Sequence, residues 1–157
     1  MGSGSDAHEA LAAPLGRWIA EGGHHLLTGG GGGVVASVSA AFVATRPRDG
    51  VCIGVLRGPE GRPGYPNPSV EIPIRTPLPL SGAMGTDPRS RNHVNVLTSD
   101  LVIALPGGEG TRSEVQLAVR YGRPVILHGP RDAFWEWPPA PHAETLDEVA
   151  RWAREVG

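Results

Sequence analysis

The most specific pattern of chemically useful residues is the run PGGEGT at residues 106–111, followed by Glu114. Glycine lets backbone N–H groups approach a phosphate closely, because no Cβ stands between them. A carboxylate in the first turn of a following helix is kept ionised by the helix dipole, which suits a base or a group that stabilises positive charge. The spacing of Thr111 and Glu114 also matches a helix capping box, which alone would explain both residues.

Two more glycine turns precede expected helices, one at residues 2–6 and one in the five consecutive glycines 29–33. Ligands of open α/β sheets bind at the carboxyl ends of the strands, where helix N-termini present free N–H groups. Three such turns on one edge of the sheet favour a phosphate-binding site over the alternative that each turn merely connects a strand to a helix. We expect phosphate to be bound by Gly2, Ser3, Gly4, Ser5, Gly30, Gly31, Gly32, Gly33, Gly107, Gly108, Gly110 and Thr111.

Several other kinds of site are disfavoured. The chain has no lysine, which excludes a P-loop of the GxxxxGK[ST] type and a Schiff base. A dinucleotide site would need an acidic residue after the second strand, but Arg57 follows Leu56 there, so NAD ranks low and an NADP-like phosphate contact only slightly higher. The histidines lack ligand spacing and Cys52, the only cysteine, is expected in the core, so no metal site is predicted.

Length and composition indicate one soluble domain over residues 1–157. Hydrophobic residues make up 39% of the chain, which is enough for a core. The net charge of -2 does not provide the excess positive charge that is typical of nucleic-acid-binding domains. Neither a membrane-spanning run nor a signal peptide is recognisable. These features predict a cytoplasmic protein without nucleic-acid or membrane partners.

Alternating elements are expected to position the glycine turns. Periodicity and apolar runs predict strands at residues 24–28, 51–56, 70–75, 101–105 and 125–127. Helices are predicted at residues 6–21, 34–45, 89–98, 112–121 and 146–156. Because of Pro14, the first is expected to be kinked or broken near Ala13. The third is expected to turn Val94 and Leu97 inward, and the last to begin with a Thr145–Glu148 capping box. Pro73 assigns the third strand to a sheet edge or an irregular conformation.

This alternation implies a Rossmann-like three-layer αβα domain with a mainly parallel sheet and right-handed crossovers. Such folds usually open with a strand that runs into the first glycine turn. Residues 1–6 already have the composition of the turn, so the opening strand is expected to be missing, unless residues 2–5 are a cloning scar.

The segment from Ser90 to Leu105, the PGGxGTxxE pattern that follows it and the five glycines resemble the Lonely Guy (LOG) family and its relatives, the molybdenum cofactor carrier proteins. The resemblance spans most of the chain from Gly2 to about Leu127. It implies a homodimer that binds a small phosphorylated ligand and requires no cofactor, with a nucleotide or molybdenum cofactor as the bound molecule.

The same resemblance leaves two functions open. In the phosphoribohydrolase members, the residues matching Arg91 and Glu114 are the catalytic pair that cleaves the N-glycosidic bond of nucleoside 5'-monophosphates. In this chain the arginine is followed by Asn92 instead of lysine, and residues 115–121 replace a tryptophan-rich stretch. Residues 82–87 and 113–125 are more similar to the carrier branch, so a binding protein that contacts its ligand through Arg91 and Asn92 is the first expectation. The segment 135–139 is either a lid or a loop facing the surface or a dimer partner.

Overall fold

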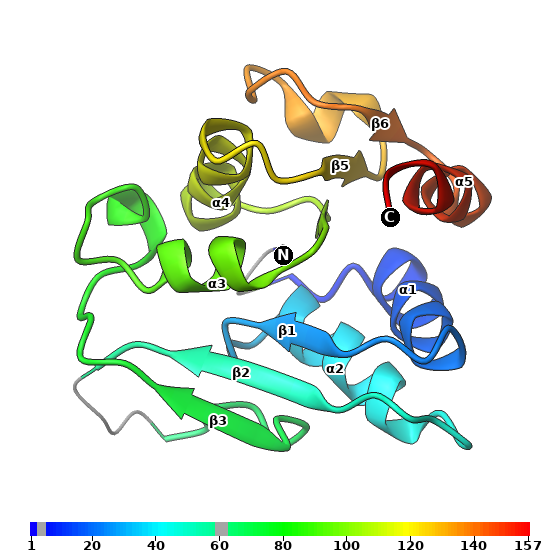
Figure 1. Ribbon diagram of the computed structural model, residues 1–157, viewed down its shortest axis with the longest axis horizontal. Coiled ribbons are helices and arrows are strands. Elements are labelled where there is room, and N and C mark those ends of the chain that lie inside the picture. Colours follow the sequence, from blue (N-terminus) through cyan, green and yellow to red (C-terminus); the bar gives the residue numbers. More distant parts are fainter. Residues whose placement is uncertain (3–5, 59–62) are drawn as a thin grey trace.

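Helices and strands alternate along the chain in the computed structural model, which describes residues 1–2, 6–58 and 63–157 (Figure 1). The strands are β1 (Leu26–Thr28), β2 (Cys52–Leu56), β3 (Ile72–Arg75), β4 (Val102–Ala104), β5 (Val125–His128) and β6 (His142–Ala143). The α-helices are α1 (Glu9–Glu21), α2 (Val34–Ala44), α3 (Asn92–Thr98), α4 (Glu109–Arg120) and α5 (Leu146–Val156). Two short 3₁₀ helices are η1 (Gly82–Met84) and η2 (Arg131–Phe134).

The strands form two three-stranded sheets, in the orders β1-β2-β3 and β4-β5-β6. Every pairing within them is parallel, with Leu26 opposite Cys52 and Ile103 opposite Ile126. β3 lies at a sheet edge, where Pro73 needs no ladder partner on its outer side. The prediction of a Rossmann-like, mainly parallel α/β fold is therefore confirmed, whereas β6 was not predicted.

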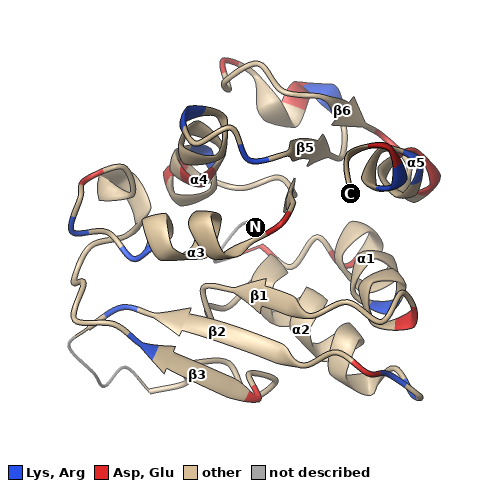
Figure 2. Cartoon of the chain, in the orientation of Figure 1, with Lys and Arg blue, Asp and Glu red and all other residues tan. Residues whose placement is uncertain are grey.

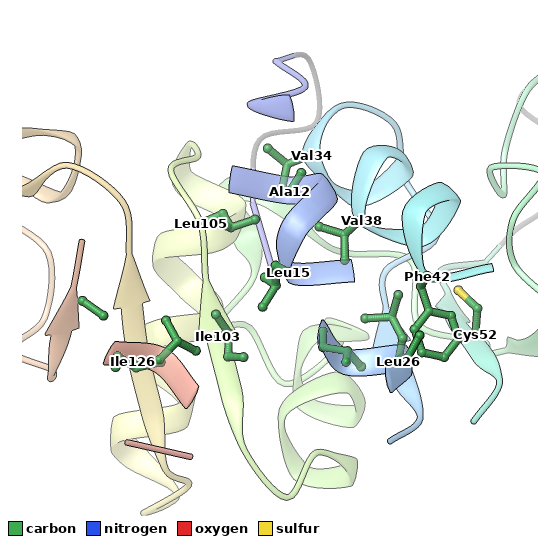
Figure 3. Close-up of a cluster of buried hydrophobic side chains, with 14 residues drawn as sticks. Ala12, Leu15, Leu26, Val34, Val38, Phe42, Cys52, Ile103, Leu105 and Ile126 are labelled. Atoms are coloured by element: carbon green, nitrogen blue, oxygen red, sulfur yellow. The ribbon is translucent and has the colours of Figure 1, made fainter. Parts of the chain in front are cut away.

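Alternate residues of β4 and β5 enter two different hydrophobic clusters. Ile103 and Ile126 pack with residues of α1, α2 and α5 (Figure 3). Val102 and Val125 pack with residues of α3 and α4 on the opposite face. Successive strand residues point to opposite faces, so a continuous apolar run indicates a sheet covered on both sides. The three layers follow directly from this alternation.

Helices α1 and α2 pack against each other at a glycine. A Cβ on Gly16 would overlap the carbonyl oxygen of Val38 and would lie 3.0 Å from the amide nitrogen of Phe42. Of the kink or break expected near Ala13, the break does not occur, since α1 runs from Glu9 to Glu21 with Pro14 inside it. Pro14 stands in the second turn, where its ring opposes only the first turn of the helix, and packing against α2 keeps the helix continuous.

Helix α3 differs from the prediction in the face that it buries. Leu97 is 45% exposed and Val94 is only half-buried, while Asn92, Asn95 and Val96 are buried. The hydrophobicity of Val94 and Leu97 was a poor guide here, because the buried asparagines find polar partners on α4.

Helix α4 begins three residues earlier than predicted. Its N-cap residue is Gly108, so Thr111 and Glu114 lie inside the helix and do not form a capping box. Glycine is tolerated at an N-cap, and here it ends the extended backbone that follows β4. By contrast, the predicted capping box of α5, between Thr145 and Glu148, is confirmed.

The first residue of the chain lies beside β4. The amino group of Met1 donates a hydrogen bond to the carbonyl of Ile103 at 2.8 Å, and the N–H of Leu105 donates to the carbonyl of Met1 at 2.8 Å. This parallel contact brings residue 2 next to the carboxyl end of β4. Among the described residues, no helix combines the length and apolar character that a membrane span needs.

His128, the last residue of β5, gives the fold a predictable response to acid. It is buried, and burial lowers the pKa of its imidazole, although a contact between Nδ1 and the carbonyl of Ala143 opposes the shift. Below about pH 6.5, the unfolded chain therefore takes up a proton that the folded chain does not. We expect the free energy of unfolding, measured with urea, to fall from pH 7.5 to pH 5.5 less steeply in His128→Gln than in the wild type. Equal slopes would contradict this account.

Candidate functional site

Gly2 brings the glycine turns that follow β1 and β4 to one place. A Cβ on Gly2 would lie 2.8 Å from the Cβ of Val34, which directly follows Gly33, and 3.3 Å from the Cβ of Leu105, which directly precedes Pro106. The two turns are therefore neighbours, with Gly2 between them. The surface formed by Gly2 and the turns at residues 29–33 and 106–111 is called the rim below. The other predicted members of the first turn, Ser3, Gly4 and Ser5, lie outside the described residues.

The carbonyl groups of the turn at residues 29–33 accept hydrogen bonds from other parts of the protein. The Tyr65 hydroxyl donates a hydrogen bond to the carbonyl of Gly29 at 3.1 Å. Asn67 donates its backbone N–H to the carbonyl of Gly30 at 2.8 Å and its Nδ2 to the carbonyl of Gly31 at 2.9 Å. Because the acceptors of the turn are used inside the protein, its peptide planes have fixed orientations.

The donors of this turn are mostly unused. The N–H of Gly30 is consumed by the Thr28 hydroxyl at 3.1 Å, so Gly30 shapes the turn, at a φ of 69°, instead of offering a donor. Within the described ranges, no hydrogen bond is formed by the N–H groups of Gly31, Gly32 and Gly33. A Cβ on Gly31 would meet nothing within 4 Å, so there is open space beside it.

The turn at residues 106–111 offers donors in the same way. The N–H groups of residues 107–111, which include Gly107 and Gly110, form no hydrogen bond with any described residue. The first N–H groups of a helix have no partner inside it and carry a partial positive charge. A Cβ on Gly108 would also point into open space, and Thr111 is 3% exposed beside it. This rim can therefore hold an anion by backbone donors.

Arg91 connects the turn at residues 29–33 to helix α4. Its guanidinium lies against Gly29, where a Cβ would overlap it, and its Nη1 is 3.6 Å from Oε1 of Glu114 on α4. The side chains of Arg91 and Glu114 are 14% and 10% exposed. Nε and Nη1 of Arg91 are buried, yet neither has a hydrogen-bond partner among the described residues. A buried arginine with unused donors is suited to charge-assisted hydrogen bonds with phosphate.

Two buried asparagines complete the cluster. Asn92 donates Nδ2 to the Ser113 hydroxyl at 3.0 Å, and Asn95 donates Nδ2 to Oε1 of Glu114 at 3.0 Å. Asn92 was a predicted site residue, whereas Asn95 and Ser113 were not. The four-residue spacing of Arg91 and Asn95, which places both on one helix face, was the signal that could have found Asn95.

Charged residues outside this cluster lie mostly on helices and loops, with basic segments near the ends of β2 and β3 and before α3 (Figure 2). The described residues contain no group of histidine, cysteine and carboxylate side chains that could hold a metal ion. Cys52 is fully buried, and burial raises the pKa of its thiol, as expected for a core residue.

The segment 135–139 is tied to α4. Arg112 donates a hydrogen bond from Nη2 to the carbonyl of Glu136 at 2.9 Å. Trp137 packs edge-on against Phe134, with ring centroids 5.0 Å apart, whereas Trp135 is 79% exposed. Trp135 therefore does not pack on the surface of its own chain, while the lid and dimer interpretations stay predictions.

Comparison with known proteins agrees with the fold. Residues 1–151 match the model of the SLOG cluster4 family. The structural-genomics target TM1055 is similar with a TM-score of 0.78 and 23% identity, over 99% of this chain and 96% of that chain. No curated protein matches the chain.

Two further similar structures are of molybdenum cofactor proteins. The molybdenum cofactor carrier protein of Chlamydomonas reinhardtii has a TM-score of 0.75 and 27% identity, over 99% of this chain and 94% of its own. The molybdenum cofactor binding protein of the phototrophic bacterium Rippkaea orientalis has a TM-score of 0.71 and 29% identity, over 96% and 88%.

Proposed function

The chain belongs to the SLOG cluster4 family, and we propose that it is a binding protein for a phosphorylated ligand, a nucleotide or a pterin phosphate such as molybdenum cofactor. The observation that carries the proposal is the set of unused backbone donors on two neighbouring turns, together with Nε and Nη1 of Arg91, which have no hydrogen-bond partner among the described residues. Donors that are fixed before binding lose little entropy when an anion arrives. The similarity to a carrier protein and a binding protein for molybdenum cofactor supports the same class of ligand.

The residues fit the two parts of such a ligand. Backbone amides and Arg91 match the phosphate, which only accepts hydrogen bonds. Glu114 and the buried Oδ1 atom of Asn92 are acceptors, which match hydroxyl or N–H donors of a ribose or a pterin. The protein needs no further cofactor in this role. A homodimer in the cytoplasm stays a prediction from the family resemblance and the composition.

Gly108→Ala tests the donors of the cradle directly. The new methyl group meets no protein atom within 4 Å and the φ of Gly108 is -96°, so we expect an unchanged melting temperature. The same methyl group would keep a phosphate from approaching the amides. We expect the affinity for AMP, measured by calorimetry, to fall about tenfold, which corresponds to ~1.4 kcal/mol. Unchanged affinity would place the phosphate elsewhere.

A phosphoribohydrolase is the second candidate, and the buried pair of Arg91 and Glu114 at 3.6 Å favours it. In this reaction a water would attack C1′ of the ribose, the C1′–N bond would break, and the base would leave with a proton. The Glu114 carboxylate would stabilise the positive charge that develops on the sugar.

Incubation with AMP and with cytokinin-type monophosphates separates the two candidates. The carrier proposal expects a phosphate compound or pterin that copurifies with the protein, identified by mass spectrometry, and no free base by chromatography. Release of free base that Glu114→Ala abolishes, with the fold intact, would replace the carrier proposal by the hydrolase. The absence of any copurified ligand, of AMP binding and of base release would reject both.

A further inference from the structure

Asn95 is a buried polar residue that neither candidate function uses. It lies on α3, one helical turn after Arg91, and is 1% exposed. Its Nδ2 donates a hydrogen bond to Oε1 of Glu114 at 3.0 Å. Glu114, taken as a whole residue, is 8% exposed, so this hydrogen bond is shielded from water. A hydrogen bond to a shielded carboxylate is among the stronger ones in proteins.

The orientation of the Asn95 amide follows from its partner. An ionised carboxylate only accepts hydrogen bonds, so Nδ2 of Asn95 must face Glu114 and Oδ1 must face away. Oδ1 is buried and finds no partner among the described residues. A buried acceptor without a partner is destabilising, so this arrangement is not explained by folding alone.

Asn95 and Arg91 meet the same oxygen of Glu114. Nη1 of Arg91 is 3.6 Å from Oε1, the oxygen that also accepts from Asn95. The other oxygen, Oε2, forms no hydrogen bond with the described part of the chain. The carboxylate is thus anchored at one oxygen and left with an idle acceptor at the other.

We propose that Asn95 is a positioning residue, which holds Glu114 by Oε1 and thereby presents Oε2 to a hydroxyl or N–H donor of the bound ligand. This inference rests on the proposed function, because it needs a ligand whose phosphate is held by Arg91 and the two turns. The ligand therefore carries a donor group next to its phosphate, as a sugar phosphate does. Inorganic phosphate, held by the turns and Arg91 alone, does not need Asn95.

The test is a double-mutant cycle on ligand affinity with Asn95→Leu, Glu114→Gln and the double variant. Leucine has the branched shape of asparagine, although it is larger, and has no donor, and glutamine replaces an acceptor oxygen of Glu114 by an amide. Calorimetry measures the Kd of AMP and of inorganic phosphate for each variant. Leu97→Ala, at an exposed position of the same helix, is the matched control and should change neither Kd.

We expect Asn95→Leu to weaken AMP binding about tenfold, the factor for ~1.4 kcal/mol, and to leave phosphate binding unchanged. In the Glu114→Gln background the same substitution should have almost no further effect, since Asn95 acts only through Glu114. If Asn95→Leu does not fold, as judged by its melting curve, Asn95→Ser replaces it.

Two results would overturn the inference: an equal loss of AMP and phosphate affinity, or a full tenfold effect that persists in Glu114→Gln. The first would indicate general damage to the rim and the second a role independent of Glu114. A wild-type protein that binds neither AMP nor phosphate would instead reject the proposed function, and the inference with it.

Discussion

Replacement of Arg91 by alanine is expected to weaken AMP binding about 100-fold. The guanidinium lies between Gly29 of one turn and Glu114 of α4, and its Nε and Nη1 have no hydrogen-bond partner in the described protein. Each charge-assisted hydrogen bond to phosphate contributes roughly 1.5–3 kcal/mol, so the loss of two of them gives at least this factor. Calorimetry with AMP measures the effect.

Arg89→Ala is the matched control, because it removes the same charge two residues away. The Arg89 side chain is 69% exposed and is paired with Asp87, so we expect AMP affinity to change by less than about twofold. Arg91→Lys keeps the charge without the planar fork and should retain part of the affinity. Arg91→Lys also replaces Arg91→Ala in the experiment if the alanine variant does not fold because the buried Glu114 charge has lost its partner. Wild-type affinity in a folded Arg91→Ala protein would show that the ligand binds elsewhere.

Gly16→Val should destabilise the fold by about 1–3 kcal/mol, the usual range for overpacking a core. The first added carbon would overlap the carbonyl of Val38 and would lie 3.0 Å from the amide nitrogen of Phe42 and from the Cβ of Ala41. Two of these are backbone atoms, which cannot rotate away as a side chain can. Helix α2 would have to move, and urea denaturation would measure the loss of free energy of unfolding.

Ala10→Val separates this effect from helix propensity, since Ala10 lies at an exposed position of the same helix. Propensity alone predicts that Gly16→Ala would stabilise α1 by roughly 1 kcal/mol. Packing predicts that even Gly16→Ala is destabilising, so the sign of its effect distinguishes the two. A more stable Gly16→Ala protein would mean that the helices separate easily.

Much of the architecture was predictable because its causes are local. The apolar run 101–105 contains β4, and the Thr145–Glu148 pair marks the start of α5. These predictions depend on residues a few positions apart, which the sequence displays side by side. Pro14 misled for the same reason: its local cost is outweighed by contacts with α2, a partner that is remote in the sequence.

The candidate site was predicted less completely. Periodicity and glycine spacing indicated the turns, and the family resemblance added Arg91 and Glu114. Neither indicated Asn95, because the prediction turned Val94 and Leu97 inward, and Asn95 lies on a different face of the helix. Tyr65 and Asn67, which fix the turn at residues 29–33, belong to a proline-rich segment without periodicity. Such contacts arise only when distant segments meet.

The two three-stranded sheets share no ladder among the described residues, and each contributes one of the glycine turns. A molecule gripped by both turns would act as a crosslink between the halves of the domain. Binding would then raise the midpoint of heat unfolding in proportion to the logarithm of free ligand concentration, once that exceeds Kd. Screening of candidate metabolites by thermal shift is therefore well matched to this architecture.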